Sequence, residues 1–122
     1  MKVITTSSDR YLHILPIFCH LFNFYWSKDQ QVEIVGYNPP PYNLPTNFNF
    51  VSLGKQTEDK QNFTRDLRKY FSKQDRFFVW MMEDTFLRSP VDFKALNLVK
   101  SLTEKFTDVG RVNLTREGMK QD

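Results

Sequence analysis

Several features that direct a protein to particular environments are scarce or missing in this chain of 122 residues. It has a single cysteine, Cys19, so no disulfide can form within the chain. The longest apolar stretch, Leu12–Trp26, is interrupted by Pro16 and polar residues and falls short of the roughly 20 residues that a membrane-spanning helix needs. Residues 1–10 carry charges and hydroxyls where a signal peptide has its apolar core. We therefore expect a soluble, cytoplasmic protein.

Glycine-rich phosphate-binding loops are also missing. The chain has four glycines, and neither the G-x-G-x-x-G pattern nor the G-x-x-x-x-G-K-[ST] pattern occurs. These absences argue against a Rossmann dehydrogenase and against a P-loop ATPase. The net charge is +3, but the 17 basic residues are interspersed with 14 acidic ones and form no basic run, so we expect no nucleic-acid binding. A phosphorylated ligand would need only a few of these cations.

The chain does contain enough apolar material to build a core. Apolar residues make up 40% of it, and 12 residues are Phe, which excludes a disordered tail. The length suits one compact domain and is too small for two. We therefore expect residues 1–122 to form a single domain.

Hydrophobic periodicity predicts alternating strands and helices. In chain order the pattern gives strand, helix, strand, proline loop, strand, helix, strand, helix and strand, over residues 2–6, 10–26, 31–36, 37–46, 47–52, 63–71, 76–82, 95–106 and 109–114. Pro16 should kink or interrupt the first helix. The run 76–82 is the most apolar, which indicates a central strand buried on both faces. The order predicts an α/β fold, a three-layer α/β/α sandwich with a mostly parallel sheet.

Ligands of open parallel sheets bind beyond the carboxyl ends of the strands, so the residues that follow each strand are the candidates for a site. Thr5, Thr6 and Ser7 offer hydroxyls and the beginning of a helix, which together can hold a phosphate or the polar edge of a base. They can equally serve only as a strand end and a helix cap. Tyr37 could stack on a base, or Gly36 and Tyr37 could simply form a turn.

Glu83 and Asp84 directly follow the most apolar strand. Two adjacent carboxylates at the rim of a buried strand are costly unless a cation or hydrogen-bond donors compensate them. A divalent metal that bridges a diphosphate would do so, because Mg²⁺ and Mn²⁺ favour one or two protein carboxylates together with phosphate oxygens. A helix cap, or an ion pair with Arg88 or Arg65, would compensate them as well.

Other candidate side chains give weaker signals. His13 and His20 are two helical turns apart, too far for one metal ion, and Cys19 completes no spacing of the zinc type. We interpret all three as structural.

Five segments of the chain resemble a known family when they are taken together in order. They are Val3–Tyr11, Phe22–Trp26, Phe48–Gly54, Phe63–Arg68 and Trp80–Leu87. In sequence and spacing they are similar to the amino-terminal half of a GT-A-type glycosyltransferase, in particular to the small glycosyltransferases encoded by large chlorella-type viruses. The resemblance implies a GT-A fold in which the carboxy-terminal acceptor half is short or absent. If the chain is viral, as the resemblance implies, it would be located in the host cytoplasm.

The resemblance also implies a function. Such a domain binds a nucleotide-diphosphate sugar, with Mn²⁺ or Mg²⁺ on the diphosphate, and transfers the glycosyl group to a hydroxyl of a glycan or other acceptor. Thr5, Thr6 and Tyr37 would contact the base or ribose, and the neighbouring pair Arg65 and Asp66 would face the donor. Glu83 and Asp84 would form the metal motif, with Asp84 as the metal-facing carboxylate, although position 86 is Phe where an Asp-x-Asp motif would place its second acid. No residue identifies a catalytic base.

Two other functions fit the same pattern. The first is a non-catalytic α/β interaction module that self-associates through exposed aromatic side chains, with residues 110–122 completing a dimer interface. The second is a nucleotidyltransferase, or another phosphate-handling enzyme, that uses the carboxylates of Glu83 and Asp84.

Overall fold

A computed structural model describes residues 1–57, 61–74 and 77–114. The chain divides into two compact units, residues 1–91 and residues 92–122, and each is described by itself.

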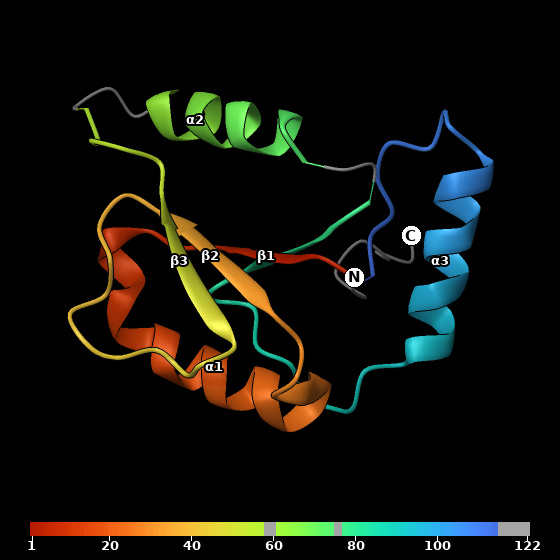
Figure 1. Cartoon of the computed structure of the whole chain (residues 1–122), viewed down its shortest axis with the longest axis horizontal. Coiled ribbons are helices and arrows are strands. Elements are labelled where there is room, and N and C mark those ends of the chain that lie inside the picture. Colours follow the sequence, from red (N-terminus) through yellow and green to blue (C-terminus); the bar gives the residue numbers. More distant parts are fainter. Residues whose placement is uncertain (58–60, 75–76, 115–122) are drawn as a thin grey trace, which may run out of the picture. The chain divides into compact units, whose positions relative to one another are not determined.

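The first unit is built on a sheet of four parallel strands (Figure 1). The strands are β1 (Val3–Thr6), β2 (Val32–Gly36), β3 (Phe48–Ser52) and β4 (Val79–Met82). They lie in the order β3-β2-β1-β4, and each neighbouring pair is parallel. The α/β class and the parallel sheet expected from the sequence are therefore confirmed.

The connection from β1 to β2 is helical along most of its length. It consists of a 3₁₀ helix η1 (Asp9–Ile14), the helix α1 (Leu15–Phe22) and a π-helical segment η2 (Asn23–Ser27). Pro16 lies in the first turn of α1, where its missing N–H leaves no helical hydrogen bond unmade. The predicted interruption at Pro16 is thus confirmed as a change from 3₁₀ to α-helical geometry.

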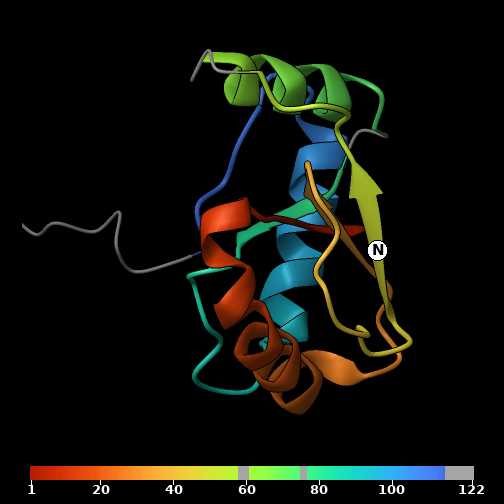
Figure 2. The same cartoon turned by 90° about the vertical axis from the view of Figure 1, so that its left-hand side faces the viewer.

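Helices cover both faces of the sheet in this unit. On one face, Phe18 and Phe22 of α1 are buried, and Phe22 packs edge-on against Phe48 with ring centroids 5.6 Å apart. On the other face, α2 (Gln61–Ser72) buries Leu67 in a cluster with Ile4 and Val35. Figures 1 and 2 show α1 and α2 on opposite sides of the strands. Each fully buried side chain of this size contributes about 1.5–3 kcal/mol, so two such layers hold the sheet between them.

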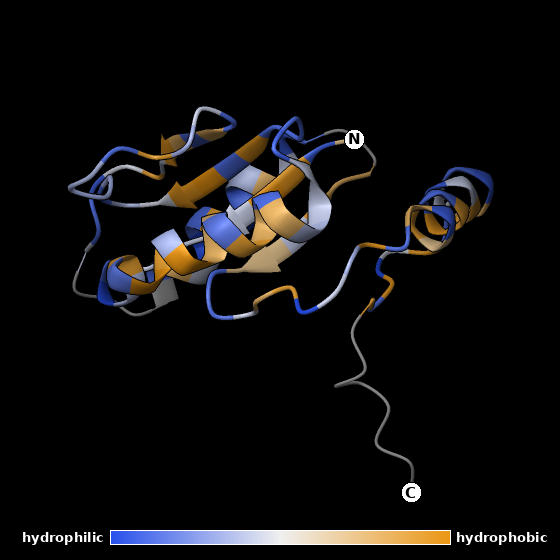
Figure 3. Ribbon diagram, turned by 90° about the horizontal axis from the view of Figure 1, so that it is seen from below, coloured by the Kyte–Doolittle hydropathy of each residue, from blue (hydrophilic) through white to orange (hydrophobic). Residues whose placement is uncertain are grey.

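The hydropathy of the elements agrees with these layers. Most residues of α1 are hydrophobic (Figure 3); its buried residues include Leu15, Phe18 and Phe22, while its hydrophilic residues, Pro16 and His20, are exposed. Such a pattern is typical of a helix with one face on a sheet and the other in water.

The prediction that the apolar run 76–82 forms a central strand buried on both faces is wrong. β4 starts at Val79 and lies at one edge of the described sheet, next to β1 only. Trp80 is 45% exposed and Met82 is 49% exposed. The apolar content of the segment predicts a strand of the sheet. It does not determine the position of that strand, which depends on the side of β1 to which the chain returns.

The second unit is described over residues 92–114 and contains helix α3 (Phe93–Lys105). Asp92 caps α3 by accepting a hydrogen bond from the amide of Ala95 at 3.0 Å. The strand predicted over 109–114 is wrong, because these residues form no strand. A strand needs a neighbour for its backbone hydrogen bonds, and no described strand pairs with this segment. The polar end, 115–122, lies outside the described residues.

Among the helices that the structure describes, none combines the length and the apolar character required to cross a bilayer.

Candidate functional site

The order of the strands reverses at β1. From β1 the chain moves outward through β2 to β3 and then returns to the other side of β1 as β4. In an open parallel sheet such a reversal leaves a crevice outside the carboxyl ends of the two strands that flank it. Here those strands are β1 and β4, and the residues that follow them are Ser7 and Ser8 on one side and Glu83 and Asp84 on the other.

A hydrogen bond joins the segments that follow β1 and β4 at this reversal. The backbone amide of Ser8 donates to Oε1 of Glu83 at 3.2 Å. Glu83 is only 6% exposed, and this burial raises the pKa of its carboxyl, partly offset by hydrogen bonds from backbone amides. Glu83 therefore holds the loop after β1 against the end of β4.

Among the described residues, the buried hydroxyl of Ser7 has no hydrogen-bond partner. The hydroxyl of Ser8 makes no hydrogen bond of normal geometry there, but it lies near enough to the Glu83 carboxylate to oppose the rise in the pKa of that carboxyl. Ser7 is 2% exposed, and its backbone is fixed because its amide donates to the carbonyl of Val35 at 2.8 Å. Ser8 stands at the start of η1 but makes no side-chain cap hydrogen bond. An unpaired buried hydroxyl costs about 1–3 kcal/mol, and nearly all buried polar groups in proteins are paired. The Ser7 hydroxyl is thus a buried polar group at this edge of the sheet that finds no partner among the described residues.

Gly36 allows the ends of β1 and β2 to approach closely. A Cβ at this position would lie 2.7 Å from the carbonyl oxygen of Ser7 and 3.5 Å from the ring of Phe50. Because the nearest atom belongs to the backbone, it could not move away without displacing the loop after β1. Only glycine fits the chain at this point.

A second cluster lies between the end of β2 and α2. The hydroxyl of Tyr37 donates to Oδ2 of Asp66 at 2.7 Å, and its ring lies 6.0 Å from that of Phe63. Burial, together with the carboxylate of Asp66, raises the pKa of Tyr37 to about 12, while the nearby Arg65 acts in the opposite direction. Tyr37 is 4% exposed, so its ring and hydroxyl are engaged inside the protein.

The two threonines of β1 use their hydroxyls within the sheet. Thr5 donates to the carbonyl of Met81 at 3.1 Å, and Thr6 accepts from Nε1 of Trp80 at 3.2 Å. Both threonines are buried. Among the hydroxyls predicted to contact a ligand, that of Ser7 is the one with no hydrogen-bond partner within the described part of the chain. Ser8 was not among the site residues predicted from the sequence, and its place directly after Ser7 is the signal that could have identified it.

The structure brings the predicted site residues together in two groups. The first group lies at the strand-order reversal, where Glu83 accepts a hydrogen bond from Ser8, the residue after Ser7. The second group lies between the end of β2 and α2, where Tyr37 contacts Asp66 and its pKa is affected by Arg65. The two groups lie at the ends of adjacent strands, because β1 and β2 are paired.

The carboxylates of this edge differ in what they could offer a metal ion. Glu83 is buried and accepts from Ser8, while Asp84 is exposed. The described residues contain no group of three or more His, Cys, Asp or Glu side chains that could hold a metal. A site made by protein ligands alone does not fit them. An ion held by one carboxylate and completed by phosphate oxygens and water does fit, and Mg²⁺ commonly binds in this way.

No model of a known protein family matches this chain, and no curated protein matches it either.

Proposed function

We propose that this chain binds a nucleotide-diphosphate sugar at the carboxyl edge of its sheet, as the donor-binding half of a GT-A-type glycosyltransferase does, for glycosyl transfer to a hydroxyl acceptor. The observation that supports the proposal is the buried hydroxyl of Ser7, which has no hydrogen-bond partner among the described residues and lies beside Ser8 at the point where the strand order reverses. Nucleotides bind at such reversals in open α/β sheets. The hydroxyls would donate to phosphate oxygens or pair with the polar edge of the nucleoside.

Asp84 is the residue that we assign to the metal. Exposed beside the crevice, it would hold Mn²⁺ or Mg²⁺ together with the oxygens of the diphosphate. Such an ion, when bound, offsets the negative charge on a departing nucleotide diphosphate. Glu83 has a different role in this proposal, because it accepts a hydrogen bond from the Ser8 amide and so positions the loop that carries Ser7 and Ser8.

Arg65 and Asp66 belong to the donor side of the proposed site. Asp66 is fixed by the hydroxyl of Tyr37, and Arg65 is close enough to affect the pKa of that hydroxyl. The guanidinium of Arg65 would add positive charge near the diphosphate. Arginine binds phosphate through charge-assisted hydrogen bonds. Thr5, Thr6 and Tyr37 would support the site through the sheet and α2, since their hydroxyls are already engaged.

Calorimetric titration tests the proposal. The chain is titrated with UDP- and GDP-sugars, with and without Mn²⁺, and we expect saturable heat for at least one donor, with tighter binding when Mn²⁺ is present. A panel that produces no saturable heat for any nucleotide, with or without metal, would overturn the donor-binding proposal. Donor hydrolysis without added acceptor then measures turnover separately from binding.

One observation favours a second function, an interaction module that self-associates. In β4, an edge strand of the described sheet, Trp80 and Met82 are 45% and 49% exposed. An exposed apolar edge strand is a template for pairing with another chain. Sedimentation equilibrium distinguishes the two functions, since an interaction module would dimerise at micromolar concentration and bind no nucleotide.

A further inference from the structure

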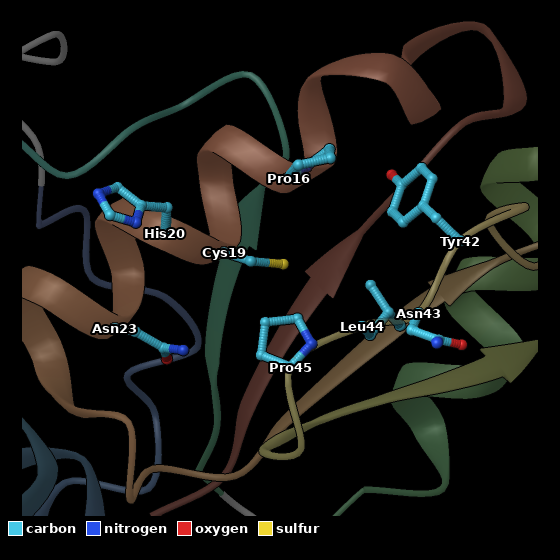
Figure 4. A pocket seen from close by; sticks show the side chains of 8 residues that line it. All are labelled: Pro16, Cys19, His20, Asn23, Tyr42, Asn43, Leu44 and Pro45. Carbon is cyan, nitrogen blue, oxygen red and sulfur yellow. The ribbon is translucent and has the colours of Figure 1, made fainter.

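A pocket of about 290 Å³ lies between α1 and the proline-rich loop (Figure 4). Four residues of the helical segment line one side, Pro16, Cys19, His20 and Asn23, at the i, i+3, i+4, i+7 spacing of one helix face. Residues 42–45 of the loop line the other side. The pocket shares no residue with the crevice at the carboxyl edge of the sheet.

Hydrogen bonds fix both walls of this pocket. On the loop side, the hydroxyl of Tyr42 donates to the carbonyl of Leu12. On the helix side, the amides of Asn23 and Asn47 pair reciprocally, at 2.8 and 3.3 Å, and Asn47 also donates to the carbonyl of Gln30 at 2.9 Å. The loop is further stiffened by its prolines, whose φ angles are fixed. A ligand would thus meet a preformed site and would lose little affinity to ordering the protein.

The chemistry of the lining selects against charge. Among the residues that the structure describes, no Lys, Arg, Asp or Glu lines the pocket. Burial raises the pKa of the Cys19 thiol to about 12, so it is neutral, and the Tyr42 hydroxyl is engaged with Leu12. Asn43 and His20 are exposed and offer hydrogen bonds at the rim. A charged ligand would lose hydration here and find no carboxylate, ammonium or guanidinium in return.

We propose that this pocket binds a small, uncharged molecule built on one or two planar rings with a hydrogen-bonding edge. Pro16, Pro45 and Leu44 supply flat or apolar surface for the rings, and Asn43 and His20 supply the polar contacts. The volume is at the small end of the about 300–1,000 Å³ that is usual for ligand pockets, which restricts the ligand to about this size.

Indole is a suitable probe, titrated into the ¹⁵N-labelled chain at pH 8 and followed by heteronuclear NMR. We expect saturable shifts of the amide signals of residues 17–23 and 42–44, and intermolecular NOEs from indole to the Leu44 methyl protons. The charged analogues tryptamine and indole-3-acetate should cause much smaller shifts at the same concentration. Binding of either analogue as tight as that of indole would overturn the assignment of an uncharged ligand.

Leu44→Trp fills the pocket and should abolish the indole shifts. Leu21→Trp makes the same change at another half-buried leucine, on α1 but outside the pocket, and should leave the shifts unchanged. Retention of indole binding in Leu44→Trp would overturn the proposal. So would the absence of saturable shifts or of NOEs to Leu44 in the unsubstituted chain, a result that does not depend on how either variant folds.

Discussion

The backbone amide of Ser8 and the carboxylate of Glu83 are joined by a hydrogen bond of 3.2 Å, although they are 75 residues apart in the chain. This contact links the loop that follows the first strand to the end of the last one. Since β1 and β4 flank the reversal of the strand order, the bond fixes the geometry of the crevice that we assign to donor binding.

Glu83→Ala should destabilise the first unit. The substitution leaves the Ser8 amide without its acceptor, which lowers the free energy of unfolding by about 1–3 kcal/mol. Glu83→Gln keeps an acceptor oxygen and should cost less. The neighbouring Asp84→Ala changes an exposed carboxylate and should stay within about 0.5 kcal/mol. Urea denaturation measures all three, and equal losses for Glu83→Ala and Asp84→Ala would show that the Ser8 contact contributes nothing.

Removal of the Ser7 and Ser8 hydroxyls should separate binding from stability. In Ser7→Ala/Ser8→Ala, the Ser7 oxygen that has no partner among the described residues is lost together with the Ser8 hydroxyl, so we expect the free energy of unfolding to rise by about 1 kcal/mol. Donor affinity should fall at least about tenfold, the value of one lost hydrogen bond to a charged group. Ser101→Ala, an exposed position on α3, is the control. If the double variant binds the donor with the same affinity as the unsubstituted chain, the two hydroxyls are not part of the donor site.

Gly36→Ala should strain the crevice. Its Cβ would lie 2.7 Å from the Ser7 carbonyl oxygen, and the resulting displacement costs about 1–3 kcal/mol. Gly110→Ala is the matched control, because its Cβ would meet no atom within 4 Å. Thermal unfolding of the two variants compares them directly, and a melting temperature for Gly36→Ala equal to that of Gly110→Ala would mean that the β1 and β2 ends are not so close in solution.

Asp84→Asn tests the metal assignment. The amide keeps the shape of the side chain but removes the charge, so donor affinity in the presence of Mn²⁺ should fall by about tenfold or more. Affinity without Mn²⁺ should be unchanged. If calorimetry gives the same affinity with Mn²⁺ for Asp84→Asn as for the unsubstituted chain, Asp84 does not hold the metal.

The raised pKa of Tyr37 predicts that the folded state loses stability at high pH. Its pKa rises from 10.0 to about 12 on folding, because of burial and the Asp66 carboxylate. The folded state therefore keeps a proton that the unfolded chain releases, so this contribution is complete below pH 10 and is lost between pH 10 and about 12. Tyr37→Phe should reduce the fall in urea midpoint between pH 9 and 11. Tyr11→Phe, at an exposed position, should not, and identical pH profiles for the two variants would exclude this role of Tyr37.

The sequence predicted most elements of the fold because their patterns are local. The helical spacing around Leu67 and the strand ending at Gly36 depend on nearby residues, and both are confirmed. The position of β4 could not be predicted, since the apolar run containing Trp80 is equally compatible with a central and an edge strand. Residues 109–114 alternate like a strand, but strand formation depends on a partner elsewhere in the chain.

The candidate site was predictable in its location but not in its contacts. The rule that ligands bind beyond parallel strands directed attention to Ser7 and Glu83, which do lie at the same edge. It could not show that the Thr5 hydroxyl faces a carbonyl of β4, or that the Ser7 hydroxyl finds no partner among the described residues. Both facts depend on side-chain directions across neighbouring strands, which the spacing of residues in a sequence does not contain.

The most direct test of the central claim is to map the amide signals of the ¹⁵N-labelled chain during titration with the donor sugar nucleotide that gives heat in calorimetry, in the presence of Mg²⁺. Binding at the strand-order reversal predicts saturable shifts centred on Ser7, Ser8, Glu83 and Asp84, with little change at Lys2 and Gln31 near the opposite ends of the strands. Saturable shifts centred on Lys2 and Gln31, or none at Ser7 and Ser8, would contradict it.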